Sequence, residues 1–235
     1  MNFFMKSSFK KSDGIIYHSK FAKKIVNKQI RNPISVIIPI GVNSKYYKEP
    51  EKKEFQSKLT INLLYVSSVF LYKYQWNVIK SVYKLMKKNK YKNKFKLKLI
   101  GNGENIAMNK TFNCLNELNN PDYIEFIYDL PTPYENLHLE YKNCDIFVFA
   151  STCENLPNNL LEAMASGNPI ACSKKEPMTD ILGDAAEYFA ADDIDSIANS
   201  IENIINNPSL SLERAQKAYE ISKTYYLGRM YKKDI

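Results

Sequence analysis

The apolar positions of this chain fall into short runs that alternate with amphipathic stretches. The runs are typical of strands buried on both faces of a parallel sheet, and they span residues 61–67, 95–100, 123–128, 146–150, 170–173 and 187–190. Apolar residues recur at helical spacing in residues 75–88, 106–118, 134–142, 160–165, 194–206 and 211–226, with a short turn near 179–182. This alternation predicts an α/β fold with a Rossmann-like, doubly wound parallel sheet and helices on both faces.

The beginning of the chain follows a different pattern. Residues 13–26 indicate a short strand that leads into a helix, and the apolar run of residues 34–40 indicates a second strand that ends in a turn. Residues 45–58 are polar and charged, as expected of a linker. We therefore divide the chain into residues 1–58 and a regular α/β domain with C-terminal helices, residues 59–235.

One stretch of the α/β domain combines strand, loop and helix signals in a short space. A polar loop follows the buried strand of residues 146–150, and Pro157 stands where the first helical residue is expected. The short helix is expected to close with Gly167 as its C-cap and Pro169 beyond it. The strand of residues 170–173 comes next, so the stretch predicts a strand–loop–helix–strand unit.

This unit carries two glutamates that could serve one ligand. The N-terminus of the helix presents N–H groups and the positive end of a dipole, which suits a phosphate. Glu162 lies about two turns into the helix, where it could accept hydrogen bonds from the vicinal hydroxyls of a ribose, and Glu154 could reach another polyol. A nucleotide diphosphate sugar would use all three features. By spacing alone, both glutamates could equally be solvated surface charges.

The amino-acid sequence of this stretch resembles a motif of a known family. Seven residues separate Glu154 from Glu162, and the residues after Glu162 that match the family are Ala163, Met164, Ala165, Gly167 and Pro169. In this respect the stretch resembles the retaining glycosyltransferases of family 4 (glycosyl transferases group 1), which have the GT-B fold. The resemblance implies that Glu154 positions the donor sugar and that Glu162 holds the ribose. A variant of the family's glycine-rich loop is expected to bind the donor through Asn155, Leu156, Pro157, Asn158 and Asn159, with backbone N–H groups facing the diphosphate.

The loop after the first strand of the α/β domain also bears on donor binding. In the resembled family, an Arg and a Lys in this loop clamp the donor diphosphate. Lys73 aligns with that Lys, whereas Ser68 stands where Arg is usual and brings a hydroxyl group without a charge. Stabilisation of the leaving group is therefore expected to rest more on Lys73 and the helix dipole, with Lys73 and Glu154 as the catalytic residues. The alternative is that Lys73 is one solvated lysine among many.

Other candidate residues carry weaker signals. Gly101 and Gly103 flank Asn102 after the strand of residues 95–100, where they could let the backbone approach a nucleotide or could simply form a turn. Neither His18 nor His138 falls in a matched motif, so we expect no catalytic role for them. The sequence has no metal-ligand cluster and no Asp-x-Asp motif of the metal-dependent transferase type, so we expect no metal and no cofactor, with the nucleotide sugar as co-substrate.

The resemblance also suggests what each part of the chain does. Residues 1–58 correspond to a remnant of the N-terminal acceptor domain plus the interdomain linker, and residues 59–235 to the nucleotide-sugar-binding domain. The expected activity is sugar transfer with retention to a saccharide or lipid-linked acceptor, in bacterial cell-surface polysaccharide or lipopolysaccharide synthesis. Most of the acceptor domain would be missing. The alternative is a non-catalytic or partner-dependent subunit that needs a separate acceptor-domain chain.

The charge of the chain is unevenly distributed. Residues 1–110 contain 24 Lys or Arg and 5 Asp or Glu, whereas residues 111–235 contain 9 Lys or Arg and 20 Asp or Glu. The net charge of the whole chain is +8. The basic half suggests an anionic partner, either the diphosphate donor or a membrane surface, or else a solvated lysine-rich surface. We do not expect nucleic-acid binding, because the basic half contains no recognised nucleic-acid module.

The cysteines and the hydropathy indicate where the protein works. Four cysteines, Cys114, Cys144, Cys153 and Cys172, show no paired or metal-like spacing and are expected to be buried or semi-buried thiols of a reducing compartment. No apolar stretch approaches the length of a membrane span. We therefore expect a cytoplasmic protein, with peripheral contact at the inner face of the plasma membrane.

Overall fold

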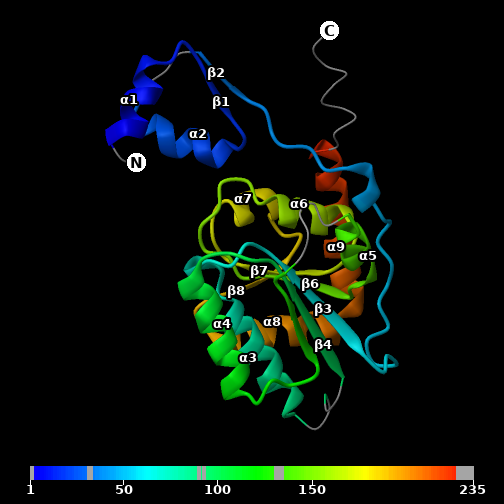
Figure 1. Cartoon of the computed structure of the whole chain (residues 1–235). Helices are drawn as coiled ribbons and strands as arrows, with labels where there is room; N and C mark the ends of the chain where they lie inside the picture. Colours follow the sequence, from blue (N-terminus) through cyan, green and yellow to red (C-terminus); the bar gives the residue numbers. More distant parts are fainter. Residues whose placement is uncertain (1–2, 31–33, 89–90, 92–93, 130–134, 226–235) are drawn as a thin grey trace.

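The structure is a computed structural model that describes residues 3–30, 34–88, 91, 94–129 and 135–225 (Figure 1). A small N-terminal unit contains α1 (Phe3–Lys11), β1 (Ile15–Tyr17), α2 (Lys20–Asn27) and β2 (Ser35–Ile37). β1 and β2 run parallel, with Ile16 opposite Val36. The predicted strand, helix and second strand are confirmed, whereas α1 lies in a lysine-rich stretch whose pattern predicted no helix.

The rest of the chain forms an α/β domain. Its strands are β3 (Ile61–Val66), β4 (Phe95–Ile100), β5 (Ile124–Ile127), β6 (Ile146–Phe149), β7 (Ile170–Ser173) and β8 (Glu187–Phe189). Its helices are α3 (Gln75–Met86), α4 (Asn105–Glu117), α5 (Leu137–Asn143), α6 (Asn158–Ala165), α7 (Met178–Leu182), α8 (Ile194–Asn206) and α9 (Pro208–Ser222). Short 3-10 helices are η1 (Ser44–Tyr46), η2 (Leu71–Lys73) and η4 (Lys223–Tyr225).

The six strands form one parallel sheet in the order β5-β4-β3-β6-β7-β8. This order reverses direction between β3 and β6, as in a doubly wound fold. Helices α3, α4 and α8 pack together, and α5, α6 and α9 form a second group (Figure 1). Right-handed crossovers place the two groups on opposite faces of the sheet, so the predicted fold class is confirmed. The central strands are apolar on both sides, and Leu64, Phe147 and Ile79 of the core are fully buried.

The bounds of α6 differ from the prediction by one residue at each end. Pro157 is the N-cap rather than the first helical residue, because its carbonyl accepts the first bonds of the helix, from the N–H groups of Leu160 and Leu161. Ser166 is the C-cap. Gly167 follows it with a φ of +68°, the left-handed conformation that commonly ends a helix. The start predicted for α5, residue 134, and the end predicted for α9, residue 226, lie outside the described residues.

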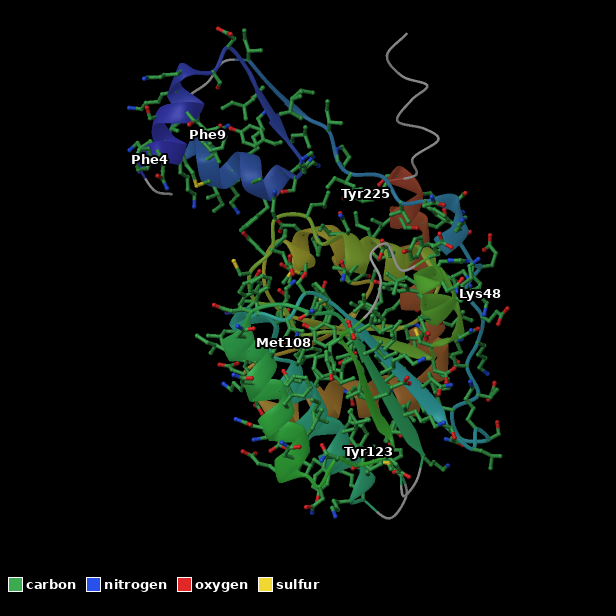
Figure 2. The ribbon with its side chains drawn as sticks, in the orientation of Figure 1. Phe4, Phe9, Lys48, Met108, Tyr123 and Tyr225 are labelled. Atoms are coloured by element: carbon green, nitrogen blue, oxygen red, sulfur yellow. The ribbon has the colours of Figure 1, made fainter. Side chains whose placement is uncertain are left out.

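The segment predicted to be a polar linker is docked on the α/β domain. The backbone N–H of Lys48 donates to the carbonyl of Ala165 at 3.0 Å, at the end of α6. A Cβ at Gly167 would lie 2.4 Å from the Lys48 carbonyl oxygen, so a side chain there would displace the linker. Further along, the Lys58 ammonium group reaches the buried Asp145 carboxylate at 2.5 Å. In Figure 2, Lys48 lies on the same side of the domain as α9 and Tyr225.

Candidate functional site

Three loops meet at the carboxyl edge of the sheet. The loop after β3 and the loop after β4 exchange backbone hydrogen bonds, since Val69 N–H donates to the Asn102 carbonyl at 3.0 Å and Glu104 N–H donates to the Val69 carbonyl at 2.9 Å. The loop after β6 joins them through Thr152 N–H, which donates to the Tyr72 carbonyl at 2.9 Å. Ligands of open parallel sheets bind at this edge, beside the point where the strand order reverses.

The two glycines after β4 are required by the packing of these loops. A Cβ at Gly101 would lie 2.0 Å from the Ser67 carbonyl oxygen, and a Cβ at Gly103 would lie 2.1 Å from the Val69 carbonyl oxygen. Gly101 also has a φ of +144°, which L side chains rarely adopt. The backbone that approaches these glycines is therefore the neighbouring loop, which favours the turn interpretation. A contact with a nucleotide stays a prediction.

Lys73 and Glu154 form an ion pair that joins the loops after β3 and β6. Both side chains are largely shielded from solvent. The ammonium group of Lys73 also lies 5.3 Å from the centre of the Phe149 ring and 5.4 Å from that of Tyr72. The Tyr65 hydroxyl, from β3, donates to the Lys73 carbonyl at 2.6 Å and fixes the backbone of η2. Lys73 is thus a positioned cation and not a solvated lysine.

Ser68, in the loop after β3, is exposed at the same carboxyl edge of the sheet. Its carbonyl accepts a hydrogen bond from the Gln75 side-chain amide at 3.2 Å, and the same amide nitrogen donates to the Ser67 hydroxyl at 3.0 Å. Gln75 begins α3, so this pair of bonds ties the loop to the helix that follows it. The Ser68 hydroxyl remains on the open side of the loop, where the resemblance places a donor-binding side chain.

Two asparagines of the predicted donor-binding loop bind other parts of the chain. The Asn155 side-chain oxygen accepts a hydrogen bond from the Ser19 hydroxyl at 2.9 Å, which connects the N-terminal unit to the loop. The Asn159 amide donates to the Val66 carbonyl at 2.7 Å and holds the start of α6 against the end of β3. Leu156 packs against the core, Pro157 is buried, and Asn158 is exposed at the N-terminus of α6.

Glu162 lies apart from the ion pair, between Tyr46 of the linker and Tyr141 of α5. Burial raises the pKa of its carboxyl group to about 7, and the two phenols oppose the shift by stabilising the carboxylate. Tyr141 is completely buried, and in the part of the chain that the structure describes its hydroxyl has no hydrogen bond of good geometry. A buried donor that faces a carboxylate in this way is costly unless a further group completes the arrangement.

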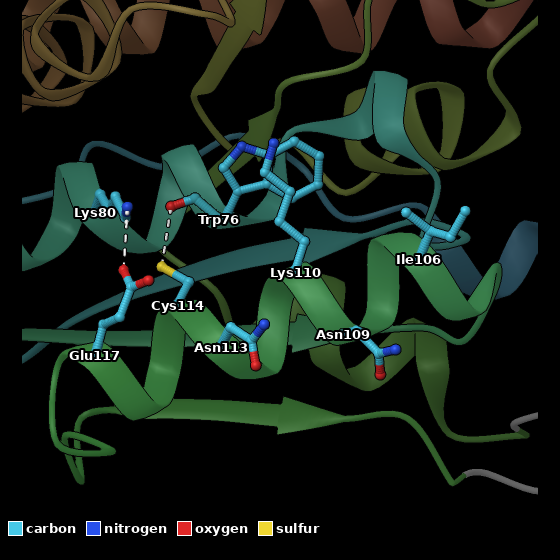
Figure 3. A pocket seen from close by; sticks show the side chains of 8 residues that line it. All are labelled: Trp76, Lys80, Ile106, Asn109, Lys110, Asn113, Cys114 and Glu117. Carbon is cyan, nitrogen blue, oxygen red and sulfur yellow. Dashed lines mark hydrogen bonds and ion pairs between the residues drawn. The ribbon is translucent and has the colours of Figure 1, made fainter.

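Two cavities at the surface of the described residues lie away from this site. One, of about 390 Å³, lies between α3 and α4, where the Lys110 ammonium group sits 4.0 Å from the centre of the Trp76 ring (Figure 3). Another, of about 590 Å³, is lined by β3, β4, β5 and α5 at the opposite half of the strands. Over the described ranges, no cluster of His, Cys, Asp and Glu could hold a metal ion, and no helix is long and apolar enough to cross a membrane.

The histidines and cysteines lie as follows. His138 lies on α5, where its ring and that of Tyr46 are T-shaped with centres 6.3 Å apart, and the His18 Nδ1 atom lies 2.9 Å from the Ile38 carbonyl oxygen. Three of the cysteines are buried, as expected, whereas Cys153 is exposed. The expectation of a buried or semi-buried thiol is wrong for Cys153, which lies in the loop between β6 and α6 and is exposed there together with Asn155.

The fold and this edge define a class of protein: a Rossmann-type α/β domain with a cation, a carboxylate and a helix N-terminus gathered at the carboxyl ends of its strands. Residues 46–223 match the model of the family described as glycosyl transferases group 1, and the chain belongs to this family. The match covers most of the α/β domain and of the linker, and it confirms the membership of glycosyl transferases group 1 that the motif of residues 154–169 indicates.

Two curated relatives match this chain over part of their own length. The chain is 25% identical over 233 residues to the alpha-monoglucosyldiacylglycerol synthase of Streptococcus pneumoniae, covering 93% of this chain and 51% of the synthase. It is 28% identical over 170 residues to an uncharacterized glycosyltransferase of Methanocaldococcus jannaschii, and the match covers 69% of this chain and 40% of that protein. The chain therefore spans about half the length of the curated relatives it matches.

Solved structures of low identity share the fold. The sucrose-phosphate synthase of Thermosynechococcus elongatus has a TM-score of 0.78 at 18% identity, covering 96% of this chain and 57% of that one. HepE of Anabaena, solved in complex with UDP and glucose, has a TM-score of 0.76 at 16% identity, covering 93% and 61%. A GtfA/B complex has a TM-score of 0.68 at 18% identity, covering 97% and 45%.

Some residues of the site could not be found from the sequence. Tyr46 and Tyr141 flank Glu162, and Ser19 binds Asn155, yet none of the three belongs to the motif that indicates the site. The helical pattern could place Tyr141 on a buried face of α5, but it does not say what that face meets. Tyr46 lies in a stretch that was predicted to be a polar, charged linker.

Proposed function

We propose that this chain is the donor-binding half of a retaining, metal-independent glycosyltransferase. The observation that carries the proposal is the shielded ion pair between Lys73 and Glu154, which lies at the carboxyl edge of the sheet beside the N-terminus of α6. Lysine donates through three N–H groups, so Lys73 can hold Glu154 and a diphosphate oxygen together. The membership of the glycosyltransferase family and the UDP complex of the similar HepE structure support a nucleotide-sugar donor.

In the proposed reaction, the bond between the anomeric carbon and the diphosphate oxygen breaks, and its electron pair goes to that oxygen. Lys73 and the N-terminus of α6 stabilise the charge that develops there. The acceptor hydroxyl attacks the same face of the sugar, and its proton passes to the departing diphosphate oxygen, so configuration is retained. Glu154 orients the sugar, and Glu162 binds the ribose hydroxyls. The surroundings of the acceptor hydroxyl come from an acceptor domain.

The proposed acceptor is a saccharide or a lipid-linked saccharide of the bacterial cell surface, in polysaccharide or lipopolysaccharide synthesis. The similar pneumococcal protein is named as a synthase of a glucosylated diacylglycerol, which supports a lipid-linked acceptor. We place the reaction in the cytoplasm, at the inner face of the plasma membrane, where the excess of Lys and Arg in residues 1–110 suits an anionic surface.

A titration of thermal stability with UDP, GDP and ADP tests the donor site. One of the nucleotides is expected to stabilise the protein by about 2.7 kcal/mol at a concentration of 100 times its Kd, which raises Tm by roughly 5–10 °C. Glu162→Ala should lose most of this shift, because a charged hydrogen-bond acceptor for the ribose is gone. Glu213→Ala, on the exposed side of α9, is the matched control and should keep the shift. An unchanged affinity in folded Glu162→Ala would refute the ribose assignment.

A second candidate function is a subunit that depends on a partner for its acceptor domain. On one face of the parallel pair β1–β2, Ile16, Val36 and Ile38 are 63%, 49% and 41% exposed. Ile16 and Val36 are paired in register, and Ile38 follows two residues later, so they form one apolar stripe. Parallel strands are normally covered on both faces, so this stripe fits an α/β acceptor domain, which the length of the relatives supports. The similar GtfA/B structure is a complex of two proteins.

Co-purification with an acceptor domain, encoded upstream or by an adjacent gene, tests this second candidate. The wild-type chain is expected to form a one-to-one complex, and Val36→Lys should weaken that complex at least roughly tenfold because it buries a charge in an apolar interface. Nucleotide binding should stay unchanged. Leu59→Lys, at a residue that is 91% exposed directly after the linker, is the control. Transfer by the isolated chain, or a complex insensitive to Val36→Lys, would refute the candidate.

A further inference from the structure

The loop between β6 and α6 is held at two consecutive residues from two different parts of the chain. The Glu154 carboxylate pairs with Lys73 of η2, and the Asn155 side-chain oxygen accepts a hydrogen bond from the Ser19 hydroxyl at 2.9 Å. Among the described residues, none of the backbone N–H groups of residues 153–156 donates a backbone hydrogen bond. The position of this part of the loop therefore depends on side-chain contacts such as those of Glu154 and Asn155.

Ser19 has a fixed orientation in the N-terminal unit. It directly precedes α2 and caps this helix, since its hydroxyl oxygen accepts a hydrogen bond from Ala22 N–H at 3.0 Å. The cap holds the hydroxyl oxygen in place, and the hydroxyl proton remains to be donated to Asn155. Ser19 is also shielded, with an exposed fraction of only 7%. One hydroxyl thus begins a helix of the N-terminal unit and holds a loop of the α/β domain that lies 136 residues later in the chain.

A second contact joins α2 to the α/β domain but contributes less. Lys24 of α2 pairs with Glu176, in the loop between β7 and α7, at 3.4 Å, and the two side chains are 54% and 44% exposed. An exposed ion pair stabilises little and is screened by salt. The hydrogen bond from Ser19 carries no net charge, so salt does not screen it. In Figure 1, α2 faces the end of the domain where α6 and α7 lie, as both contacts require.

We propose that Asn155 is a positioning residue, held by Ser19, through which the N-terminal unit sets the place of Glu154 in the donor site. The proposal rests on the donor site proposed above. A displacement of Asn155 moves the backbone of Glu154, and with it the carboxylate that pairs with Lys73. A loop that is already held in place has less order to gain when a ligand binds. The affinity for a nucleoside diphosphate therefore depends on a contact made from outside the α/β domain.

The same contact acts in the opposite direction. A ligand that fixes Lys73 and Glu154 also holds Asn155 where it accepts the bond from Ser19, so the N-terminal unit docks more firmly on the α/β domain. By linkage, docking favours ligand binding to the same extent. The N-terminal unit also carries the apolar stripe of β1 and β2, so the contact orients whatever that stripe binds relative to the donor site.

A double-mutant cycle on nucleotide affinity tests the proposal. Calorimetric titration uses whichever of UDP, GDP and ADP stabilises the wild type, on Ser19→Ala, on Asn155→Ala and on the double variant. Each single variant is expected to bind roughly threefold to tenfold more weakly, and the double variant no more weakly than either, because all three lack the same bond. Losses that multiply in the double variant, or wild-type affinity in Ser19→Ala, would overturn the positioning role.

Two controls separate this effect from damage to α2. Ser19→Thr keeps both the cap and the hydroxyl, so it should bind the nucleotide as the wild type does. Asp193→Ala removes the side chain that caps α8, far from the donor site, and should lower stability without changing affinity. Equal losses of affinity in Asp193→Ala and Ser19→Ala would assign the effect to the loss of a helix cap and would overturn the proposal.

Hydrogen exchange in protein without nucleotide separates this inference from the proposed function. In Asn155→Ala, the backbone amides of α2 are expected to exchange roughly threefold to tenfold faster, because the bond that holds the N-terminal unit is lost. Asn113→Ala, at an exposed asparagine of α4, is the matched control and should leave this exchange unchanged. Unchanged exchange in Asn155→Ala would overturn the inference. If the wild type binds none of the three nucleotides, the donor site fails and the role in nucleotide binding fails with it, even where the exchange changes as expected.

Discussion

Lys73→Ala is expected to lower the rate of donor cleavage by roughly two to three orders of magnitude, the range seen when a single charge-stabilising donor is removed from an active site. Lys73 is shielded, paired with Glu154 and held by its backbone, so no other described lysine can take its place. Ser68 supplies a hydroxyl where the resembled family has an arginine, which leaves Lys73 as the cation of this loop. The measurement is release of nucleoside diphosphate from the donor sugar, with acceptor domain present.

The same substitution also leaves the Glu154 carboxylate without its partner. Removing one member of a shielded ion pair costs up to about 3–5 kcal/mol, so a loss of activity in Lys73→Ala could reflect damage to the fold. The double variant Lys73→Ala/Glu154→Gln removes the orphaned charge and should recover stability while remaining inactive. Lys84→Ala is the control, because Lys84 forms an exposed ion pair with Asp195 on the outside of α3. Cleavage by Lys73→Ala within twofold of wild type would refute the role.

Gly101→Ala is expected to cause the largest loss of stability, about 3 kcal/mol or more. The new Cβ would lie 2.0 Å from the Ser67 carbonyl oxygen, at a φ of +144° that alanine rarely adopts. The loops after β3 and β4 would have to separate, and these loops carry Ser68 and Lys73. Thermal unfolding should show a Tm lower by roughly 6–12 °C.

Gly183→Ala is the matched control for that experiment. Gly183 has a φ of +55°, but a Cβ there would meet no atom within 4 Å. This variant therefore separates the cost of a positive-φ backbone conformation, which is about 1–3 kcal/mol, from the cost of the clash. An equal loss of stability in both variants would show that the loops after β3 and β4 adapt to the extra atom, and that their close approach is not required.

Much of the fold was predictable because its signals are local. The strands of residues 95–100 and 170–173 and the helix of residues 194–206 were predicted with the bounds that the structure has. Each is an apolar or periodic run that is interrupted by Gly, Pro or polar residues, and such runs depend little on distant neighbours. The α6 boundaries were displaced by one residue, because whether Pro157 caps or begins the helix depends on which carbonyl accepts the first bond.

The candidate site was predictable in part. The motif of residues 154–169 located Glu154 and Glu162 and indicated the family, and an alignment of loops singled out Lys73. Neither could show that Lys73 and Glu154 are paired, since they follow different strands and meet only where the sheet brings β3 and β6 together. The same holds for Gly101 and Gly103. These positions must be glycine because a loop more than thirty residues earlier in the chain leaves no room for a Cβ atom.

The sequence by itself determined the order of strands and helices, the family and the two glutamates, because these depend on periodicity and on a contiguous motif. Only the tertiary structure decided which groups surround them. Tyr46 and Tyr141 reach Glu162 because the linker packs along α5 and the end of α6, and the Asp145 carboxylate and the Ala165 carbonyl hold that linker in place. Burial of Glu162 is a property of this packing, and with burial comes the pKa that makes its charge sensitive to pH near neutrality.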